Sequence, residues 1–198
     1  MLIISLILII SMVGCDQLIK LLVVSNYEEC TGFIKKYYTF SIGDFDVFSL
    51  THIRNDGAGW SILGGQTVFL IAFTSVIMVG ILAYMIIKRK TLGKLDFICL
   101  SLIVAGGVGN LIDRVRMLVE PDFNGVIDYI NFEFVDFPVF NFADMCVVVG
   151  AIGYCILMVV VEIIELKKKK ALKAVELTEN VASTDDDNTL EDEQNEQI

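Results

Sequence analysis

Four long runs of apolar residues, separated by more polar segments, dominate the pattern of the chain. They cover residues 2–24, 67–87, 95–112 and 142–161. Each is close to the ~20 residues with which an α-helix crosses the ~30 Å hydrocarbon core of a membrane. Inside a membrane only a helix or a closed barrel satisfies its own backbone hydrogen bonds, and these runs lack the strict alternation of barrel strands. The pattern therefore predicts an α-helical membrane protein with four transmembrane helices.

Between the apolar runs, three short stretches have the character of β-strands. Residues 37–42 and 48–53 alternate roughly between apolar and polar positions and flank Gly43-Asp44, which predicts a hairpin. Residues 126–132 form the third stretch. We expect a small outward-facing β-sheet, a cradle that rests on the helices at the membrane surface.

The basic residues indicate the orientation. Lysine and arginine cluster at residues 88–94, after the second apolar run, and at 167–173, after the fourth. The positive-inside rule places both clusters in the cytoplasm. Both termini are then cytoplasmic, and residues 25–66 and 114–140 face outward, although these segments also contain a few basic residues.

The net charge of −10 arises mainly at the end of the chain. Residues 176–198 contain nine acidic residues and no lysine or arginine, so the rest of the chain is nearly neutral. Because this segment is polar, acidic and without aromatic residues, we expect a disordered cytoplasmic tail after a membrane domain of residues 1–175. The five cysteines form no CxxC pair and there is a single histidine, so we expect neither a disulfide framework nor a metal site.

Several aspartates lie in or beside the apolar runs, where a charge is costly and marks a candidate functional site. In the predicted orientation Asp16, Asp113 and Asp144 lie toward the outer side of three helices. Asp128 lies in the outward segment between two of them. Two neighbouring carboxylates share a proton, so one can activate a water while the other protonates a carbonyl or leaving group. Taken singly, each aspartate is about equally well explained as an interfacial residue solvated by headgroups and water.

Five short motifs contain these aspartates and their neighbours. In chain order they are Asp16-Gln17-Leu18-Ile19-Lys20, Asn55-Asp56-Gly57-Ala58-Gly59-Trp60-Ser61, Gly106-Gly107-Val108-Gly109-Asn110-Leu111-Ile112-Asp113-Arg114, Val126-Ile127-Asp128-Tyr129 and Phe140-Asn141-Phe142-Ala143-Asp144. Each is weak alone, but the ordered set closely resembles the lipoprotein signal peptidase (signal peptidase II) family of aspartic peptidases, over about residues 2–170. The chain departs from the usual family pattern at Gly59, Trp60 and Tyr129, and none of these changes removes a polar group that the mechanism needs.

The resemblance implies a membrane aspartic endopeptidase that cuts a prolipoprotein signal peptide just before its diacylglyceryl-modified cysteine, without a metal or other cofactor. Carried over by motif, the catalytic pair is Asp128 and Asp144. Asp113 is the rival for the first place, but an acid paired with Arg114 would be held ionised and less suited to sharing a proton. The implied partners are lipid-modified prolipoproteins and membrane lipids, not nucleic acid. We expect a monomer in the bacterial cytoplasmic membrane, with its active site at the outer face.

Further residues of the motifs are expected to support the pair or to bind substrate: Asn110, Asp113, Arg114, Asn141, Asn55, Gly57, Asp16 and Lys20. The asparagines and the arginine have side-chain donors for the carboxylates or for a substrate backbone. Asp16 and Lys20 are four residues apart on one helix face, and a structural pair is favoured there over a catalytic role. The glycines at 106, 107 and 109 predict close packing between helices.

Two other functions are weighed against this one. Met12-Val13-Gly14-Cys15 looks like a lipoprotein cleavage box, which would make the chain a substrate, but no positive segment precedes it and a cut there would remove a whole span. A small transporter or proton-relay subunit would also place acids in the membrane, but the two halves of the chain show no internal repeat.

Overall fold

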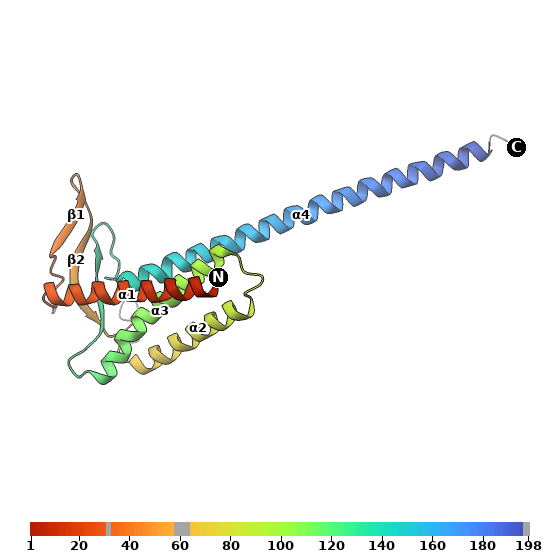
Figure 1. The fold of residues 1–198 in the computed structure, drawn as a ribbon. Helices are drawn as coiled ribbons and strands as arrows, with labels where there is room; N and C mark the ends of the chain where they lie inside the picture. Colours follow the sequence, from red (N-terminus) through yellow and green to blue (C-terminus); the bar gives the residue numbers. More distant parts are fainter. Residues whose placement is uncertain (31–32, 58–63, 196–198) are drawn as a thin grey trace. The chain divides into compact units, whose positions relative to one another are not determined.

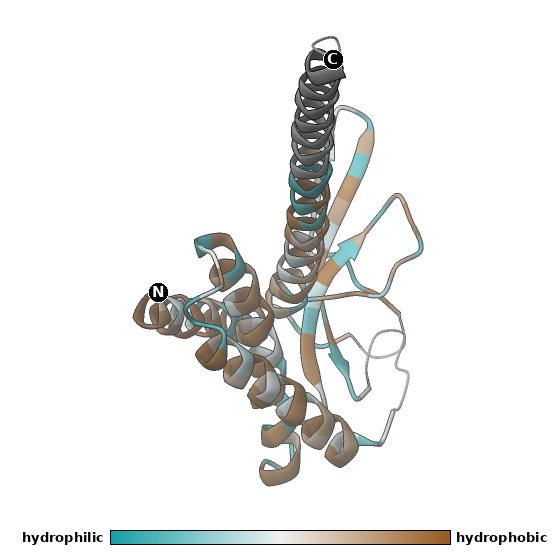
Figure 2. Cartoon of the chain, turned by 90° about the vertical axis from the view of Figure 1, so that its right-hand side faces the viewer, coloured by the Kyte–Doolittle hydropathy of each residue, from teal (hydrophilic) through white to brown (hydrophobic). Residues whose placement is uncertain are grey.

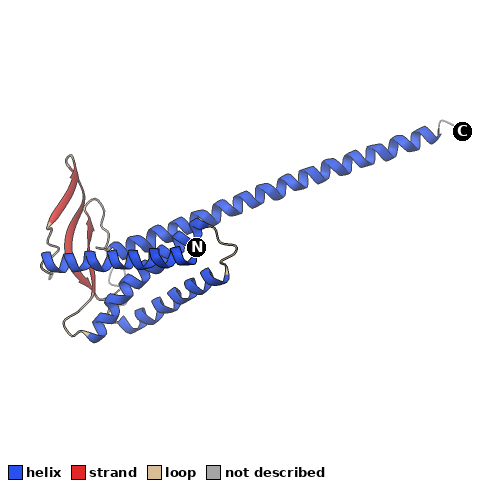
Figure 3. Ribbon diagram, viewed as in Figure 1, coloured by secondary structure: helices blue, strands red, loops and turns tan. Residues whose placement is uncertain are grey.

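The computed structural model describes residues 1–30, 33–57 and 64–195, and beyond Ala171 only the course of the backbone. The described residues form, in chain order, α1 (Leu2–Asn26), β1 (Tyr38–Ile42), β2 (Phe45–Asn55), α2 (Thr67–Ile87), α3 (Lys94–Val119), β3 (Val126–Phe132) and α4 (Phe142–Asn195) (Figures 1 and 3). Each helix is long and apolar enough to cross a membrane. The predicted fold class, four such helices with a small β-sheet, is confirmed.

The chain divides into a compact body, residues 1–154, and a second unit, residues 155–198, which contains the rest of α4. The apolar run of α4 covers residues 142–161 and is followed by charged residues, and the helix continues to Asn195. Residues 155–195 contain neither glycine nor proline, so nothing in the sequence interrupts a helix there. The disorder expected from residue 176 onward differs from this helical course and stays a prediction.

α3 is the central helix of the compact body. α1 and α2 both pack against it, and half of its most apolar 18-residue window is buried, against 11% for α1 and 17% for α2. The outer faces of α1 and α2 are therefore apolar and exposed, as a lipid environment requires (Figure 2). α3 also continues to Val119, about two turns beyond the end of its apolar run at residue 112.

Three glycines of α3 allow its neighbours to approach closely, as predicted. A Cβ added to Gly106 would lie 2.2 Å from the backbone carbonyl oxygen of Ala143 in α4. A Cβ added to Gly107 would lie 2.3 Å from the sulfur of Met78 in α2. At Gly109 it would lie 2.7 Å from a carboxylate oxygen of Asp16 in α1. Each glycine therefore faces a different helix, and the three contacts pack α1, α2 and α4 around α3.

The three strands form one antiparallel sheet in the order β1-β2-β3. The predicted hairpin is confirmed, with Gly43 in its turn at a φ of 63°, and β3 has the predicted bounds. β2 pairs with β3 so that Ile53 lies opposite Asp128 and Asn55 lies opposite Val126. A buried apolar cluster that includes Val23, Ile127 and Tyr129 joins the sheet to the helices, at one end of α1 and α3 (Figure 1).

Candidate active site

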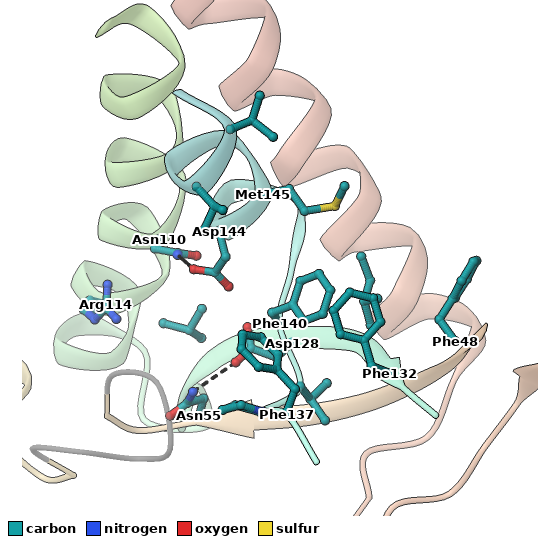
Figure 4. A pocket seen from close by; sticks show the side chains of 16 residues that line it. Phe48, Asn55, Asn110, Arg114, Asp128, Phe132, Phe137, Phe140, Asp144 and Met145 are labelled. Carbon is teal, nitrogen blue, oxygen red and sulfur yellow. Dashed lines mark hydrogen bonds between the residues drawn. The ribbon is translucent and has the colours of Figure 1, made fainter. Parts of the chain in front are cut away.

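A cavity of about 560 Å³ lies between the sheet, α3 and the beginning of α4 (Figure 4). We call it the active-site cavity. Its polar lining consists of Asn55, Asn110, Arg114, Asp128 and Asp144. The rest of its wall is apolar and consists of Phe48, Val126, Ile130, Phe132, Phe137, Pro138, Val139, Phe140, Met145, Val148 and Val149. A mostly apolar cavity with a few converging polar groups is the usual form of a binding or catalytic site.

Asp128 lies on β3 and is only 3% exposed. The Asn55 side-chain amide donates to one of its carboxylate oxygens at 3.0 Å, and the Asn141 amide donates to the other at 2.6 Å. Asn55 is the last residue of β2, next to β3 in the sheet, and Asn141 directly precedes α4. The sheet and the beginning of α4 therefore hold this carboxylate from both sides.

Asp144 lies in the first turn of α4, where a capping box fixes its side chain. Its backbone N–H donates to the Asn141 side chain at 3.0 Å, and its carboxylate accepts the Asn141 backbone N–H at 3.1 Å. The other carboxylate oxygen accepts the Asn110 amide from α3 at 2.7 Å. Because the positive end of a helix dipole favours negative charge, this position suits an ionised carboxylate.

The two aspartates are connected through side-chain amides. The Asn141 Nδ2, which donates to Asp128, also lies 3.0 Å from the Asn110 Oδ1, and Asn110 in turn donates to Asp144. In the close-up the two carboxylates point toward the same space (Figure 4). The structure thus brings together the two acids that the motifs nominated, with two of their predicted supports between them.

The environment of Asp128 changes its acidity. Burial, and secondarily the negative charge of Asp144, raise the pKa of Asp128 from 3.8 to about 7, although the hydrogen bonds from Asn55 and Asn141 act in the opposite direction. Near neutral pH this carboxyl therefore holds a proton much of the time. A carboxyl with a pKa near the working pH is the type of group that transfers protons in catalysis.

Asp113 lies outside the active-site cavity, and the prediction that it pairs with Arg114 was wrong. Its carboxylate pairs with Lys20 at 2.7 Å and is fully buried. Arg114, the expected partner, instead donates to the carbonyl of Gly57 at 3.2 Å. Successive helix residues point about 100° apart, so neighbours in sequence do not face each other. Asp113 does have a cation beside it, but that cation comes from α1.

Asp16 and Lys20 form the expected pair at 2.9 Å, and both are buried. The Lys20 ammonium also contacts Asp113 and, at 3.0 Å, the Asn110 Oδ1, so each of its three donors has an acceptor. The second oxygen of Asp16 accepts the Ala143 backbone N–H in the first turn of α4 at 3.0 Å. These contacts fit the structural role favoured for the pair, because they connect α1 to α3 and to the helix that carries Asp144.

Two residues of the motifs, Gln17 and Tyr129, were not among the predicted site residues. The Gln17 amide contacts Asp16, the Gly109 carbonyl and Asp113 at 3.1–3.3 Å. The Tyr129 hydroxyl accepts the Phe142 backbone N–H at 3.1 Å, and burial raises the pKa of Tyr129, which keeps the hydroxyl neutral. A departure from the family pattern thus supplies a cap for α4, which the sequence alone did not indicate.

Replacing Tyr129 with phenylalanine should reduce the free energy of unfolding by about 1 kcal/mol, because one N–H at the beginning of α4 loses its acceptor. The measurement is the unfolding temperature of the purified protein in detergent. Tyr38→Phe, at a largely exposed position on β1, is the matched control and should leave stability unchanged. Equal stability of both variants would contradict the capping role.

Asn55 and Gly57 lie where β2 leaves the sheet. The side-chain oxygen of Asn55 accepts a hydrogen bond from the Gly57 backbone N–H at 3.0 Å. This bond holds the side-chain amide of Asn55 so that its nitrogen donates to Asp128. With the bond from Arg114 to Gly57, this turn is connected to α3. The departures at Gly59 and Trp60 lie outside the described residues.

The described part of the chain contains no group of three or more His, Cys, Asp or Glu side chains arranged to hold a metal ion. The donors around the active-site cavity are amide groups and one guanidinium, and the acceptors are two carboxylates. Chemically, this arrangement can bind a water between the acids and exchange protons with it.

The chain matches the model of the Signal peptidase (SPase) II family over residues 8–160. The lipoprotein signal peptidase of Lactococcus lactis subsp. cremoris strain MG1363 is 39% identical over 146 residues, which is 74% of this chain and 87% of the relative. That of Enterococcus faecalis is 37% identical over 153 residues, 76% and 84% of the two chains. A bacterial membrane enzyme solved by the in meso method at 2.3 Å resolution is similar, with a TM-score of 0.63 and 29% identity over 78% of this chain and 87% of that one. This chain therefore belongs to the signal peptidase II family.

Proposed function

We propose that the chain is an aspartic endopeptidase of the bacterial membrane that removes signal peptides from prolipoproteins, cutting before the diacylglyceryl-modified cysteine. The observation that carries the aspartic mechanism is the pair Asp128 and Asp144, which line one cavity and are connected through Asn141 and Asn110. The family relationship supports the substrate class. The long apolar wall of the active-site cavity suits an apolar signal peptide and a lipid-modified cysteine.

In the proposed reaction Asp128 begins protonated and Asp144 begins ionised. Asp144 takes a proton from a water bound between them as that water attacks the scissile carbonyl carbon, and Asp128 gives its proton to the carbonyl oxygen. The product of this step is a tetrahedral diol. The amide C–N bond then breaks as Asp144 protonates the leaving nitrogen, and Asp128 recovers a proton from the diol. Each aspartate ends in its initial state.

The supporting residues have separate roles in this scheme. Asn55 and Asn141 hold the Asp128 carboxyl, and Asn110 holds that of Asp144. Arg114 lines the active-site cavity with donors that can bind a substrate backbone carbonyl. Asp16, Lys20 and Asp113 hold the helices that carry these groups.

The proposal includes a location for the reaction. The lysine and arginine clusters favour cytoplasmic termini, which supports a position of the sheet and the active-site cavity at the outer face. A substrate anchored there by its own diacylglyceryl group would reach the pair from the bilayer. The enzyme is proposed to act as a monomer among membrane lipids.

Cleavage of a diacylglyceryl prolipoprotein should fall as the pH rises above about 7, because Asp128 then loses the proton that it must donate. kcat/KM should decrease about tenfold per pH unit on this side. The measurement is the initial rate of signal-peptide release by purified enzyme in detergent, with the unlipidated form of the same substrate as a control that should not be cut. A rate that stays constant from pH 7 to 9 would contradict this role of Asp128.

The expected decline of the cleavage rate above pH 7 can be distinguished from a loss of folding stability. Between pH 3.8 and about 7 the folded chain keeps a proton on Asp128 that the unfolded chain has released, so stability through this group falls as the pH rises. Above about pH 7 both forms are deprotonated, and this contribution changes no further. Unfolding temperatures measured at each pH should therefore stay nearly level where the rate declines.

A further inference from the structure

A second, smaller cavity of about 90 Å³ lies on the α1 side of the sheet and shares no lining residue with the active-site cavity. We call it the arginine cavity. Its lining comes from α1, the end of β2, the end of α3, the segment that leads into β3 and β3 itself: Gln17, Lys20, Leu21, Val24, Arg54, Arg116, Phe123 and Ile127. Neither arginine belongs to the catalytic arrangement proposed above.

Both arginines stack on one aromatic ring. The guanidinium carbon of Arg54 lies 4.5 Å from the centroid of the Phe123 ring, and that of Arg116 lies 4.0 Å from it. Phe123 is only 5% exposed, whereas the side chains of Arg54 and Arg116 are 13% and 38% exposed, so the buried ring holds two like charges close together at the protein surface. Such a pair favours a site for an anion, because an anion placed between two cations reduces their repulsion.

Each arginine has one acidic partner at its outer edge. Glu29 accepts from the Nε of Arg54 at 3.1 Å, and Glu120 accepts from the Nε and Nη2 of Arg116 at 2.9 and 2.8 Å. The Nη1 of Arg54 is buried and has no hydrogen-bond partner among the described residues. A buried donor without an acceptor is unfavourable, so this nitrogen favours a ligand that brings an oxygen.

Lys20 adds a positive charge to the wall of the cavity but no free donor. Its three N–H groups are used by Asp16, Asp113 and Asn110, and the negative charges of the two aspartates balance it. The donors available to a ligand are therefore those of the two guanidinium groups, whose planar geometry matches the oxygens of a phosphate.

Size and surroundings restrict the ligand further. Since a water occupies ~30 Å³ in the liquid, the cavity holds a group the size of about three waters, such as one phosphate. On the α1 side Leu21 and Val24 line it and are 61% and 40% exposed. These are lipid-facing side chains beside a cationic pocket, as at the boundary between acyl chains and headgroups.

We propose that Arg54 and Arg116 bind a phosphate group, supplied by a phospholipid whose acyl chains lie along Leu21 and Val24. The inference depends on the membrane location of the chain and not on the peptidase mechanism. Arg54 directly precedes Asn55, whose amide holds Asp128. A phosphate bound between β2 and α3 would therefore also steady the strand that positions one catalytic carboxyl.

The test is the unfolding temperature of the purified full-length protein in detergent as ligands are added. Dioleoyl phosphatidylglycerol should raise it in a saturable manner, whereas dioleoylglycerol, which has the same acyl chains without phosphate, should not. Inorganic phosphate at the same concentrations tests whether the acyl chains are needed. If phosphate and phosphatidylglycerol both raise the unfolding temperature in a saturable manner, the phosphate site is supported but its ligand is phosphate in general and not specifically a lipid.

The double variant Arg54→Gln with Arg116→Gln should lose the phosphatidylglycerol-dependent increase, whatever its stability without lipid. Arg89→Gln, at an exposed position beyond α2, is the matched control and should keep it. Arg54→Lys keeps the charge without the planar fork and should retain less than half of the increase. The proposal would be overturned if phosphatidylglycerol raised the unfolding temperature of the double variant as much as that of the wild type. It would also be overturned if dioleoylglycerol raised the wild-type unfolding temperature as much as phosphatidylglycerol does.

Discussion

Replacing Asp128 or Asp144 with asparagine should reduce cleavage of a diacylglyceryl prolipoprotein by about 10³-fold or more. Asparagine keeps the size of the side chain and one of its two acceptor oxygens, but it can neither accept the proton of the attacking water nor donate one to the carbonyl. General acid–base groups contribute about 10²–10⁴-fold each, and here the two act on one water. The assay is signal-peptide release in detergent, followed over time with excess substrate.

Asp122→Asn is the matched control, because Asp122 is an exposed aspartate shortly before β3, and it should leave the rate unchanged. Asp113→Asn serves a different purpose, since it tests the rival assignment. An inactive Asp113 variant together with a normal Asp128 variant would move the catalytic pair to Asp113 and Asp144. Normal cleavage by both the Asp128 and the Asp144 variants would refute the aspartic mechanism itself.

Replacing Lys20 with methionine should reduce the free energy of unfolding by about 3–5 kcal/mol, the usual cost of removing one partner from a buried ion pair. The change leaves the carboxylates of Asp16 and Asp113 without a cation, and neither is more than 1% exposed. It also removes a hydrogen bond to Asn110, which holds Asp144. The unfolding temperature in detergent should fall sharply, and activity should fall with it.

Two further variants show whether charge is the cause. Lys35→Met removes an exposed lysine that also pairs with an acid, Glu28, and should leave the unfolding temperature nearly unchanged because water solvates both groups. Adding Asp16→Asn and Asp113→Asn to Lys20→Met removes the uncompensated charges and should restore much of the stability. If Lys20→Met is as stable as the wild type, the buried network is not held by its charges.

The structure also bears on the alternative that the chain is itself a lipoprotein. The sequence Met12-Val13-Gly14-Cys15 lies inside the continuous helix α1 (Leu2–Asn26), and Asp16, the next residue, accepts a hydrogen bond from the beginning of α4. A cut before Cys15 would separate half of α1 from the body. The arrangement favours a structural role for this segment.

Much of the fold follows from local pattern. A run of apolar residues long enough to cross a membrane can satisfy its backbone only as a helix, so the four helices were predictable from composition and length. The alternation around Gly43 predicted the hairpin, and residues 126–132 formed the expected strand. The ends of helices were less predictable: α3 continues to Val119, seven residues beyond its apolar run, and Asp113, the first residue after the run, is paired inside the body by Lys20.

By itself, the sequence determined the membrane helices, the strands and, through five ordered motifs, the polar residues around the active-site cavity. Only the tertiary structure decided which of these residues contact each other: Lys20 rather than Arg114 pairs with Asp113, and the Tyr129 hydroxyl caps α4. The physical reason is that helix and strand formation depend on neighbours in the chain, whereas these contacts join residues from α1, α3, β3 and α4. The angle and depth at which those elements pack set each distance, and no local pattern specifies them.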